Sequence, residues 1–229
     1  MENVSIGKWG VLLGVPGSGK GTLAEYLSSS KGFIVIAVGE ILRRNKLKKI
    51  ASSGCTIGEI IDSGALLPDE VVLDYIKYEL NEVDSVTSKN VLFDGFPRTV
   101  GQAKVLADIA MTFGKEIGYV LNFSVDQKII VKRVLGRYKC SKCGRMYNNF
   151  FLNPRKNGVC DVCGSVEFDR RVDDNEESLN RRLSEYHRET VPLIDFYSQA
   201  GTLKNIDAGA DIKSVRNSVL KSLGLDIGE

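Results

Sequence analysis

Short apolar runs alternate with helical patterns along this chain. Apolar residues that stand side by side over several positions are typical of a buried strand, whereas apolar residues that recur every three or four positions indicate a helix. The predicted strands are Trp9–Leu13, Phe33–Val38, Asn90–Phe93, Gly118–Phe123 and Leu203–Ile206. The predicted helices are Gly21–Ser30, Gly39–Ile50, Asp69–Val83, Thr99–Phe113, Val125–Arg137, Asn175–Ala200 and Ile212–Leu223. Apolar strands separated by helices predict an α/β fold with about five parallel strands, covered on both faces.

Two segments interrupt this alternation. Residues 39–82 carry consecutive helical patterns with no strand between them, and residues 138–170 are rich in Gly, Cys, Asn and charge without a helical period. We therefore expect a core formed by residues 1–38, 83–137 and 171–229, a helical insert at 39–82 and a small separate unit at 138–170. Appendages of this kind often act as lids.

A glycine-rich segment, Gly14-Val15-Pro16-Gly17-Ser18-Gly19-Lys20-Gly21-Thr22, follows a predicted strand and opens a predicted helix. Glycines let backbone N–H groups converge on phosphate oxygens, and the start of a helix favours an anion. Lys20 can then reach the β- and γ-phosphates. Gly21 stands where Ser or Thr usually follows the lysine, and Thr22 comes one residue later. We expect a P-loop NTPase-type core that binds a triphosphate through Gly17, Ser18, Gly19, Lys20, Gly21 and Thr22.

A second polar group, Asp94 and Arg98, follows the predicted strand Asn90–Phe93. Ligands of open parallel sheets bind outside the carboxyl ends of the strands. Asp94 is placed to hold the water shell of a Mg²⁺ ion, and Arg98 to hold a phosphate with its planar fork. Alternatively, Asp94 only caps the following turn.

Four of the five cysteines form two C-x-x-C pairs: Cys140, Cys143, Cys160 and Cys163. This spacing is a strong signature of a structural four-thiolate Zn²⁺ site, which could stabilise a unit too small to fold alone. Two disulfides or a hairpin without metal are the alternatives. Cys55 is expected to be a small buried side chain.

The composition excludes some classes of protein. The chain has 229 residues with 43% hydrophobic and 26% charged positions and a formal net charge of +2, which argues against a general nucleic-acid coat. No apolar run approaches the roughly 18–20 residues that span a bilayer, and Met1–Gly10 lacks the apolar core of a signal peptide. We expect a cytoplasmic monomer with no membrane or nucleic-acid partner, although a mitochondrial space stays open.

The motifs together resemble the adenylate kinase family of nucleoside monophosphate kinases. The resemblance combines the glycine-rich segment Gly14–Thr22 with Asp94-Gly95-Phe96-Pro97-Arg98-Thr99 and Gln102, and it extends through Val38–Arg43, the cysteine unit, Asp173-Asp174 and Glu185–His187. It covers the chain from about residue 9 onward. It implies reversible phosphoryl transfer from ATP to AMP with Mg²⁺, and a long lid that holds zinc.

The resemblance also implies roles for single residues. Arg43 and Arg98 match positions that bind the phosphate of the acceptor. Gln102 matches the position that binds the adenine of the acceptor. Val38 and Gly95 are expected beside these acceptor-binding residues. Arg133 matches an arginine near the donor adenine and Arg137 one near the donor phosphates, while Arg171 and Arg182 match arginines that close onto the transferring phosphate. The expected catalytic residues are Lys20, Arg98, Arg137, Arg171 and Arg182. The lone histidine, His187, is expected to have no role.

Three departures from the family pattern leave alternatives open. Val38 replaces a threonine that helps bind the acceptor base, as in relatives that act on UMP or CMP, whereas Gln102 and the long lid favour AMP. Glu40 replaces an aspartate and is expected only to shift a water. Asn148 stands where many relatives have His near the donor base, so GTP remains an alternative donor.

A rival from another class is a P-loop protein whose zinc ribbon grips nucleic acid. The basic and aromatic residues around the cysteines permit this function, but it gives no role to Asp94–Thr99 or Gln102. Salt-dependent binding of a labelled oligonucleotide would discriminate between the two.

Overall fold

The computed structural model of the chain describes residues 8–83 and 88–227. Residues 1–7, 84–87 and 228–229 lie outside the described part, and with them most of Met1–Gly10, where no signal peptide is expected. Among the helices of the described ranges, none has both the length and the apolar character that a membrane crossing requires.

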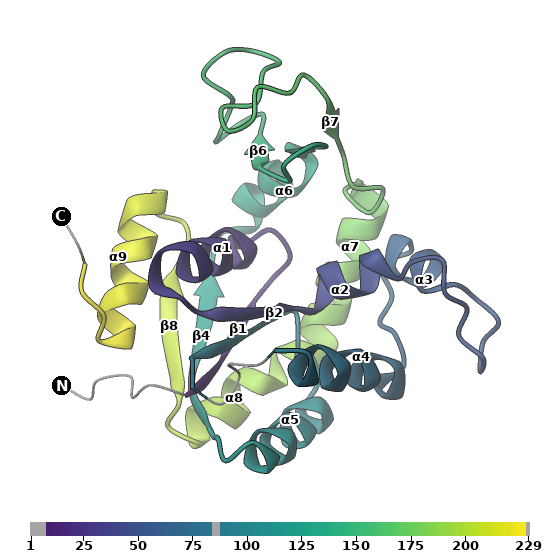
Figure 1. Ribbon diagram of the computed structural model, residues 1–229, viewed down its shortest axis with the longest axis vertical. Helices are drawn as coiled ribbons and strands as arrows, with labels where there is room; N and C mark the ends of the chain where they lie inside the picture. Colours follow the sequence, from purple (N-terminus) through teal and green to yellow (C-terminus); the bar gives the residue numbers. More distant parts are fainter. Residues whose placement is uncertain (1–7, 84–87, 228–229) are drawn as a thin grey trace.

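The centre of the described chain is a five-stranded parallel sheet, as the apolar runs predict (Figure 1). Its strands lie in the order β2-β3-β1-β4-β8. Their bounds are β1 Trp9–Gly14, β2 Ile34–Ala37, β3 Val91–Asp94, β4 Ile117–Ser124 and β8 Leu203–Asp207. Because β1 and β3 are neighbours, with Leu12 opposite Asp94, the glycine-rich loop and Asp94 come to the same edge of the sheet.

The central strands β1, β3 and β4 are largely buried, which explains their apolar sequences, whereas the edge strand β8 exposes Lys204 and Asn205. On one face, Leu12 and Leu121 pack with helices α1 (Lys20–Lys31) and α9 (Ile212–Leu223). On the other, the alternate residues Val11, Phe93 and Val120 pack with α4 (Asp69–Asn81), α5 (Val100–Thr112) and α8 (Pro192–Gln199). Successive side chains of a strand point to opposite faces, so one apolar run supplies both cores. Figure 1 shows these two helical layers on either side of the sheet.

Two predicted helices, the one that opens the insert and the one that precedes the cysteine unit, are shorter in the structure. β2 ends at Ala37, so Val38 opens α2 (Val38–Arg44), which ends well before the predicted Ile50. The backbone there turns back on itself, because Ile50 N–H donates to the Cys55 carbonyl at 2.8 Å and Lys49 bridges Thr56. A short helix, α3 (Ile57–Asp62), then begins at a capping box of Thr56 and Glu59. Similarly, α6 covers only Gln127–Leu135.

The long predicted helix Asn175–Ala200 is interrupted. It consists of α7 (Glu176–Glu185), a π-helical segment, Tyr186–Thr190, and α8. Pro192 is the first residue of α8, a position where its missing N–H is not needed. His187 lies in the π-helical segment and is exposed.

The cysteine unit forms a sheet of its own. β5 (Arg137–Cys140) pairs antiparallel with β6 (Met146–Asn148) and with β7 (Phe168–Asp169). Tyr138, Tyr147 and Phe168 make a small aromatic cluster beside the cysteines, with ring centroids 5.4–5.8 Å apart. This unit projects beyond α6 at the top of Figure 1, while α2 and α3 lie to the right of the sheet.

Cys55 contradicts the prediction of a buried side chain. It is exposed in the loop between α2 and α3, where the chain doubles back and offers no core to enter. The neighbouring residues Arg44, Lys46, Lys48 and Lys49 are also exposed, and only Arg44 of these is helical.

Candidate active site

The glycine-rich loop joins β1 to α1 in a conformation that needs its glycines. Gly17 has φ +80° and Gly19 φ +102°, in the left-handed region that side chains disfavour. A Cβ on Gly17 would lie 2.7 Å from a methyl carbon of Val134, so space as well as strain excludes a larger residue. α1 then begins at Lys20, and the free N–H groups of its first turn make this loop suited to an anion.

Lys20 reaches back over this loop. Its Nζ donates to the carbonyl oxygens of Gly14 at 2.6 Å and Val15 at 3.0 Å, and to Ser18 Oγ at 3.2 Å. Burial lowers the pKa of Lys20 from 10.5 to about 8; Asp94 opposes this shift, and nearby arginines add to it. The loop therefore holds a cation whose charge is costly until an anion joins it.

Asp94 ends β3 beside Lys20, near the start of α1. Burial raises the pKa of its carboxyl, while Lys20 and Arg98 act against that rise. A Cβ on Gly21 would lie 3.6 Å from Asp94 Oδ2, so a small residue after the lysine keeps the carboxylate close to the loop. A buried carboxylate oxygen next to a phosphate-binding loop is the kind of ligand that Mg²⁺ prefers, directly or through water. Asp94 thus fits the magnesium role expected of it.

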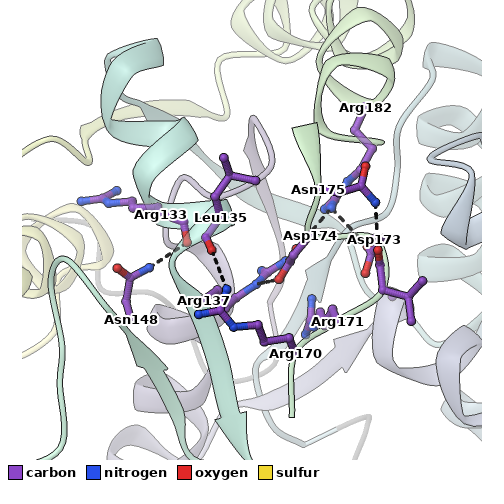
Figure 2. Close-up of polar contacts among 12 residues, drawn as sticks. Arg133, Leu135, Arg137, Asn148, Arg170, Arg171, Asp173, Asp174, Asn175 and Arg182 are labelled. Carbon is purple, nitrogen blue, oxygen red and sulfur yellow. Dashed lines mark hydrogen bonds and ion pairs between the residues drawn. The ribbon is translucent and has the colours of Figure 1, made fainter. Parts of the chain in front are cut away.

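Five arginines from distant parts of the chain gather in front of this edge. They are Arg43 on α2, Arg98 after β3, Arg137 at the start of β5, Arg171 after β7 and Arg182 on α7. Figure 2 shows Arg137 and Arg182 pointing from opposite sides at the turn formed by Asp173 and Asp174.

Buried acidic residues hold these arginines. Asp174 binds Arg137 with both oxygens, Nε donating at 2.7 Å, and its side chain is 2% exposed. Asp173 accepts from Arg43 and Arg182, each at 3.1 Å, and Arg43 and Arg182 lower the pKa of its carboxyl against the effect of burial. The acids thus orient the arginine side chains in the absence of a ligand.

The cluster is still dominated by positive charge. Burial, with repulsion from neighbouring arginines, lowers the pKa of both Arg171 and Arg182 to about 10. Burial is the largest cause of both shifts, and the nearby acids offset only part of it, whereas Asp174 raises the pKa of Arg137. An anionic ligand carrying several charges would relieve this repulsion, which is what nucleotide phosphates provide.

A cavity beside the cluster is lined by both charged and apolar side chains. Arg43, Arg98 and Arg182 belong to its lining, as do Val38 and Leu42. Arg98 is held by its Nε donating to the Gly95 carbonyl at 3.0 Å. Gln102, 3% exposed, is the buried amide in this wall. The cavity therefore offers cations for a phosphate, and apolar side chains with an amide for a flat ring with polar edges.

Helix α6 contacts the glycine-rich loop, and the cysteine unit contacts α6. Arg133 donates to the Ser18 carbonyl at 3.3 Å and lies over the Phe151 ring, 5.7 Å from its centroid. Asn148 donates to the Arg133 carbonyl at 2.8 Å (Figure 2), and its Oδ1 accepts from Phe150 N–H at 2.9 Å. Arg133 and Asn148, both expected near a donor base, therefore lie together.

The four clustered cysteines lie close enough to share one ion. Their Sγ atoms all lie within 4.8 Å of one another, with Cys140–Cys163 and Cys143–Cys160 at 3.5 Å. A disulfide would bring two sulfurs to about 2.05 Å. Four thiolates at about 2.3 Å from a tetrahedral zinc lie roughly 3.8 Å apart, so the arrangement fits Zn²⁺ with no open coordination position.

The structure thus brings the expected site residues to one edge of the sheet, except the cysteines, which cluster separately in the unit at 138–170. Sequence reasoning assigned no role to Asp173 and Asp174, and the only signal was their place in the family motif. It also expected Glu40 only to shift a water. Instead, Glu40 pairs directly with Arg171, 131 residues away, and with Arg43 at 3.2 Å.

Comparisons with known proteins point to one family. The family described as adenylate kinase matches residues 12–202. An adenylate kinase of Caldicellulosiruptor saccharolyticus is 40% identical over 216 residues, which is 94% of this chain and 99% of the relative. An adenylate kinase of Bacillus cereus is 42% identical over 205 residues, 90% and 93% of the two chains. One of Bacillus subtilis is 40% identical over 214 residues, 93% and 97%.

Proposed function

The chain belongs to the adenylate kinase family, and we propose that the edge formed by β1 and β3 performs this family's reaction. The reaction is the reversible transfer of the γ-phosphoryl group of ATP to AMP, giving two ADP. The observation that carries the proposal is the group of buried, incompletely compensated cations between the phosphate-binding loop and the acceptor cavity.

The donor is proposed to occupy the loop side. Backbone N–H groups of Gly17–Thr22 would hold its phosphates, and Lys20 would exchange its carbonyl partners for β- and γ-phosphate oxygens. The base would then lie toward Arg133, under the lid. We propose ATP as the donor, and GTP is tested below as its alternative.

The acceptor is proposed to occupy the cavity lined by Arg43, Arg98 and Gln102. The two guanidinium groups would fork onto its monophosphate, and Gln102 would meet its base. With both nucleotides in place, an acceptor phosphate oxygen attacks the γ-phosphorus while the bond to the β–γ bridging oxygen breaks and ADP leaves. Phosphate oxygens are ionised near neutral pH, so no general base is required.

The rate is proposed to come from positioning and charge. Lys20 follows the transferring group, and Arg98, Arg137, Arg171 and Arg182 stabilise the negative charge on its oxygens. The acids Asp173, Asp174 and Glu40 would keep these arginines oriented before the substrates arrive.

Two metals have proposed places. Asp94 would hold Mg²⁺ through its water shell, where the ion neutralises phosphate charge. Cys140, Cys143, Cys160 and Cys163 would hold Zn²⁺, which stabilises the lid and takes no part in the chemistry. Thiolates that bind zinc require a reducing compartment, so we propose a cytoplasmic location.

The division of the chain into a core, an insert and a lid is proposed to keep water out of the active site. We propose that the insert 39–82 and the lid 138–170 close over the core as separate bodies, because water would otherwise compete with AMP as the acceptor. We also propose that the enzyme works as a monomer, because the glycine-rich loop, Asp94 and the acceptor cavity meet at one sheet edge within one folded chain.

A coupled assay that crosses ATP and GTP with AMP, GMP, UMP and CMP tests the proposal. We expect the highest kcat/KM with ATP and AMP, no need for added zinc, and loss of activity on chelation of Mg²⁺. A preference for UMP or CMP would overturn the acceptor assignment, and a preference for GTP the donor assignment. Turnover with none of these pairs would refute the function itself.

A further inference from the structure

Gln102 and Asp69 form a hydrogen bond between two elements that lie far apart in sequence. Asp69 is the exposed first residue of α4, and Gln102 lies buried in the first turn of α5. Gln102 Nε2 donates to Asp69 Oδ1 at 2.6 Å, and Gln102 Oε1 accepts from the Arg98 backbone N–H at 2.7 Å. The bond thus joins the helical insert to the wall of the acceptor cavity.

These two partners allow the Gln102 amide only one orientation. A carboxylate has no hydrogen to donate, so the atom facing Asp69 must be the nitrogen. A backbone N–H cannot accept, so the atom facing Arg98 must be the oxygen. A flipped amide would place its oxygen against the carboxylate and its NH₂ against the Arg98 N–H, losing both bonds. One N–H and one oxygen lone pair, on adjacent sides of the amide, remain for a ligand.

We propose that Asp69 is a positioning residue that makes the acceptor site select a 6-amino purine over a 6-oxo purine. Adenine offers an N6 donor beside an N1 acceptor, whereas a 6-oxo purine offers an O6 acceptor beside an N1–H donor. The two rings therefore require opposite orientations of the amide, and Asp69 together with Arg98 permits one. This inference rests on the proposed function, because it assumes that AMP is the acceptor that Gln102 meets.

Asp69 acts on the base through Gln102 and does not touch the reacting atoms. An asparagine at this position keeps the shape but can either accept from or donate to the Gln102 amide. In this variant a flipped Gln102 amide no longer meets a repelling carboxylate at position 69, and only the Arg98 N–H still opposes the flipped orientation. Asp69→Asn should therefore relax the choice of base and leave the chemistry itself in place.

The test compares AMP with inosine monophosphate, which differs from AMP in carrying an oxo group at C6 and a proton at N1. The ratio of kcat/KM for AMP to that for inosine monophosphate should fall about tenfold in Asp69→Asn, the effect expected for a hydrogen bond to a charged group. Glu70→Gln is the matched control, since it makes the same carboxylate-to-amide change one residue along the exposed start of α4, and its ratio should stay as in the wild type.

Several outcomes would overturn the proposal. A ratio within twofold of the wild-type value, or an equal loss for both acceptors, would mean that Asp69 only supports α4. Equal use of the two acceptors by the wild type would show that the amide does not select. If Asp69→Asn does not fold, as judged by circular dichroism, Asp69→Ser is measured in its place and should give the same fall in ratio. Wild-type protein that does not use AMP at all would instead refute the proposed function.

Discussion

Raising the pH should weaken ATP binding through Lys20. The pKa of this ammonium is lowered to about 8 in the free protein, because the loop buries it beside arginines. The protonated fraction then falls from about nine-tenths at pH 7 to about one-tenth at pH 9. If only the ammonium binds the triphosphate well, kcat/KM for ATP should fall about tenfold over this interval, since that parameter reports the free enzyme.

At saturating ATP the pH dependence should be smaller. The phosphates place negative charge next to Nζ and raise its pKa in the complex, so kcat should stay nearly constant to above pH 9. Ionisation of the nucleotides contributes little to this fall, because phosphates with a second pKa of about 6 are already about nine-tenths ionised at pH 7. The assay is initial-rate kinetics from pH 7 to 9.5 at fixed ionic strength, with varied ATP and saturating AMP.

Lys20→Met supplies the control, as it keeps the volume of the side chain without its charge. Its kcat should be lower by about 10²-fold or more, and its kcat/KM should not change with pH in this range. Stability gives a second readout: the unfolded lysine binds its proton up to pH 10.5, so the wild type should gain stability relative to the variant between pH 8 and 10.5, by up to about 3 kcal/mol. A flat wild-type profile, or the same profile in Lys20→Met, would refute the assignment of this titration to Lys20.

Three further predictions concern the lid, the acceptor cavity and the arginine cluster. Freshly purified reduced protein should contain about one zinc per chain, and chelation should lower Tm while nucleotide binding partly persists; elemental analysis without zinc would contradict the metal site. Val38→Thr should lower KM for AMP about five-fold with little change in kcat, because one neutral hydrogen bond contributes about 1 kcal/mol; unchanged AMP kinetics would mean that Val38 does not face the base. Asp174→Asn should lower the free energy of unfolding by about 3 kcal/mol, as it leaves the buried Arg137 without its charged partner; a loss under about 1 kcal/mol by urea denaturation would show that solvent compensates Arg137.

The parts of the site that lie within one short segment could be predicted from the sequence. The loop Gly14–Thr22 carries its glycines, its lysine and the start of its helix in consecutive residues, and their conformation follows from local backbone preferences. The same holds for the two cysteine pairs, whose spacing places all four sulfurs within 4.8 Å of one another. Because the central strands are buried on both faces, their continuous apolar runs also identified the parallel sheet.

The local pattern of apolar residues did not predict the structure where the backbone conformation depends on tertiary packing. The apolar periodicity of Gly39–Ile50 continues past Arg44, yet the chain there forms a turn whose hydrogen bonds link Ile50 to Cys55. Cys55 is exposed for the same reason, since its surroundings depend on where that turn lies and not on its own residue type. A periodic pattern shows which side of a helix would be apolar, but not whether another backbone pairing competes with the helix.

The sequence by itself thus determined the fold class, the glycine-rich loop, the cluster of four cysteines and the residue types of the proposed phosphoryl-transfer site. Only the tertiary structure decided which acid holds which arginine. Glu40 meets Arg171 across 131 positions and Arg43 meets Asp173 across 130, while Asp69 orients Gln102 across 33. The residue type of a charged side chain does not identify its ion-pair partner, because the side chain attracts any opposite charge that the fold brings within a few ångströms. That proximity is fixed by the packing of the insert, the core and the lid, which no single segment encodes.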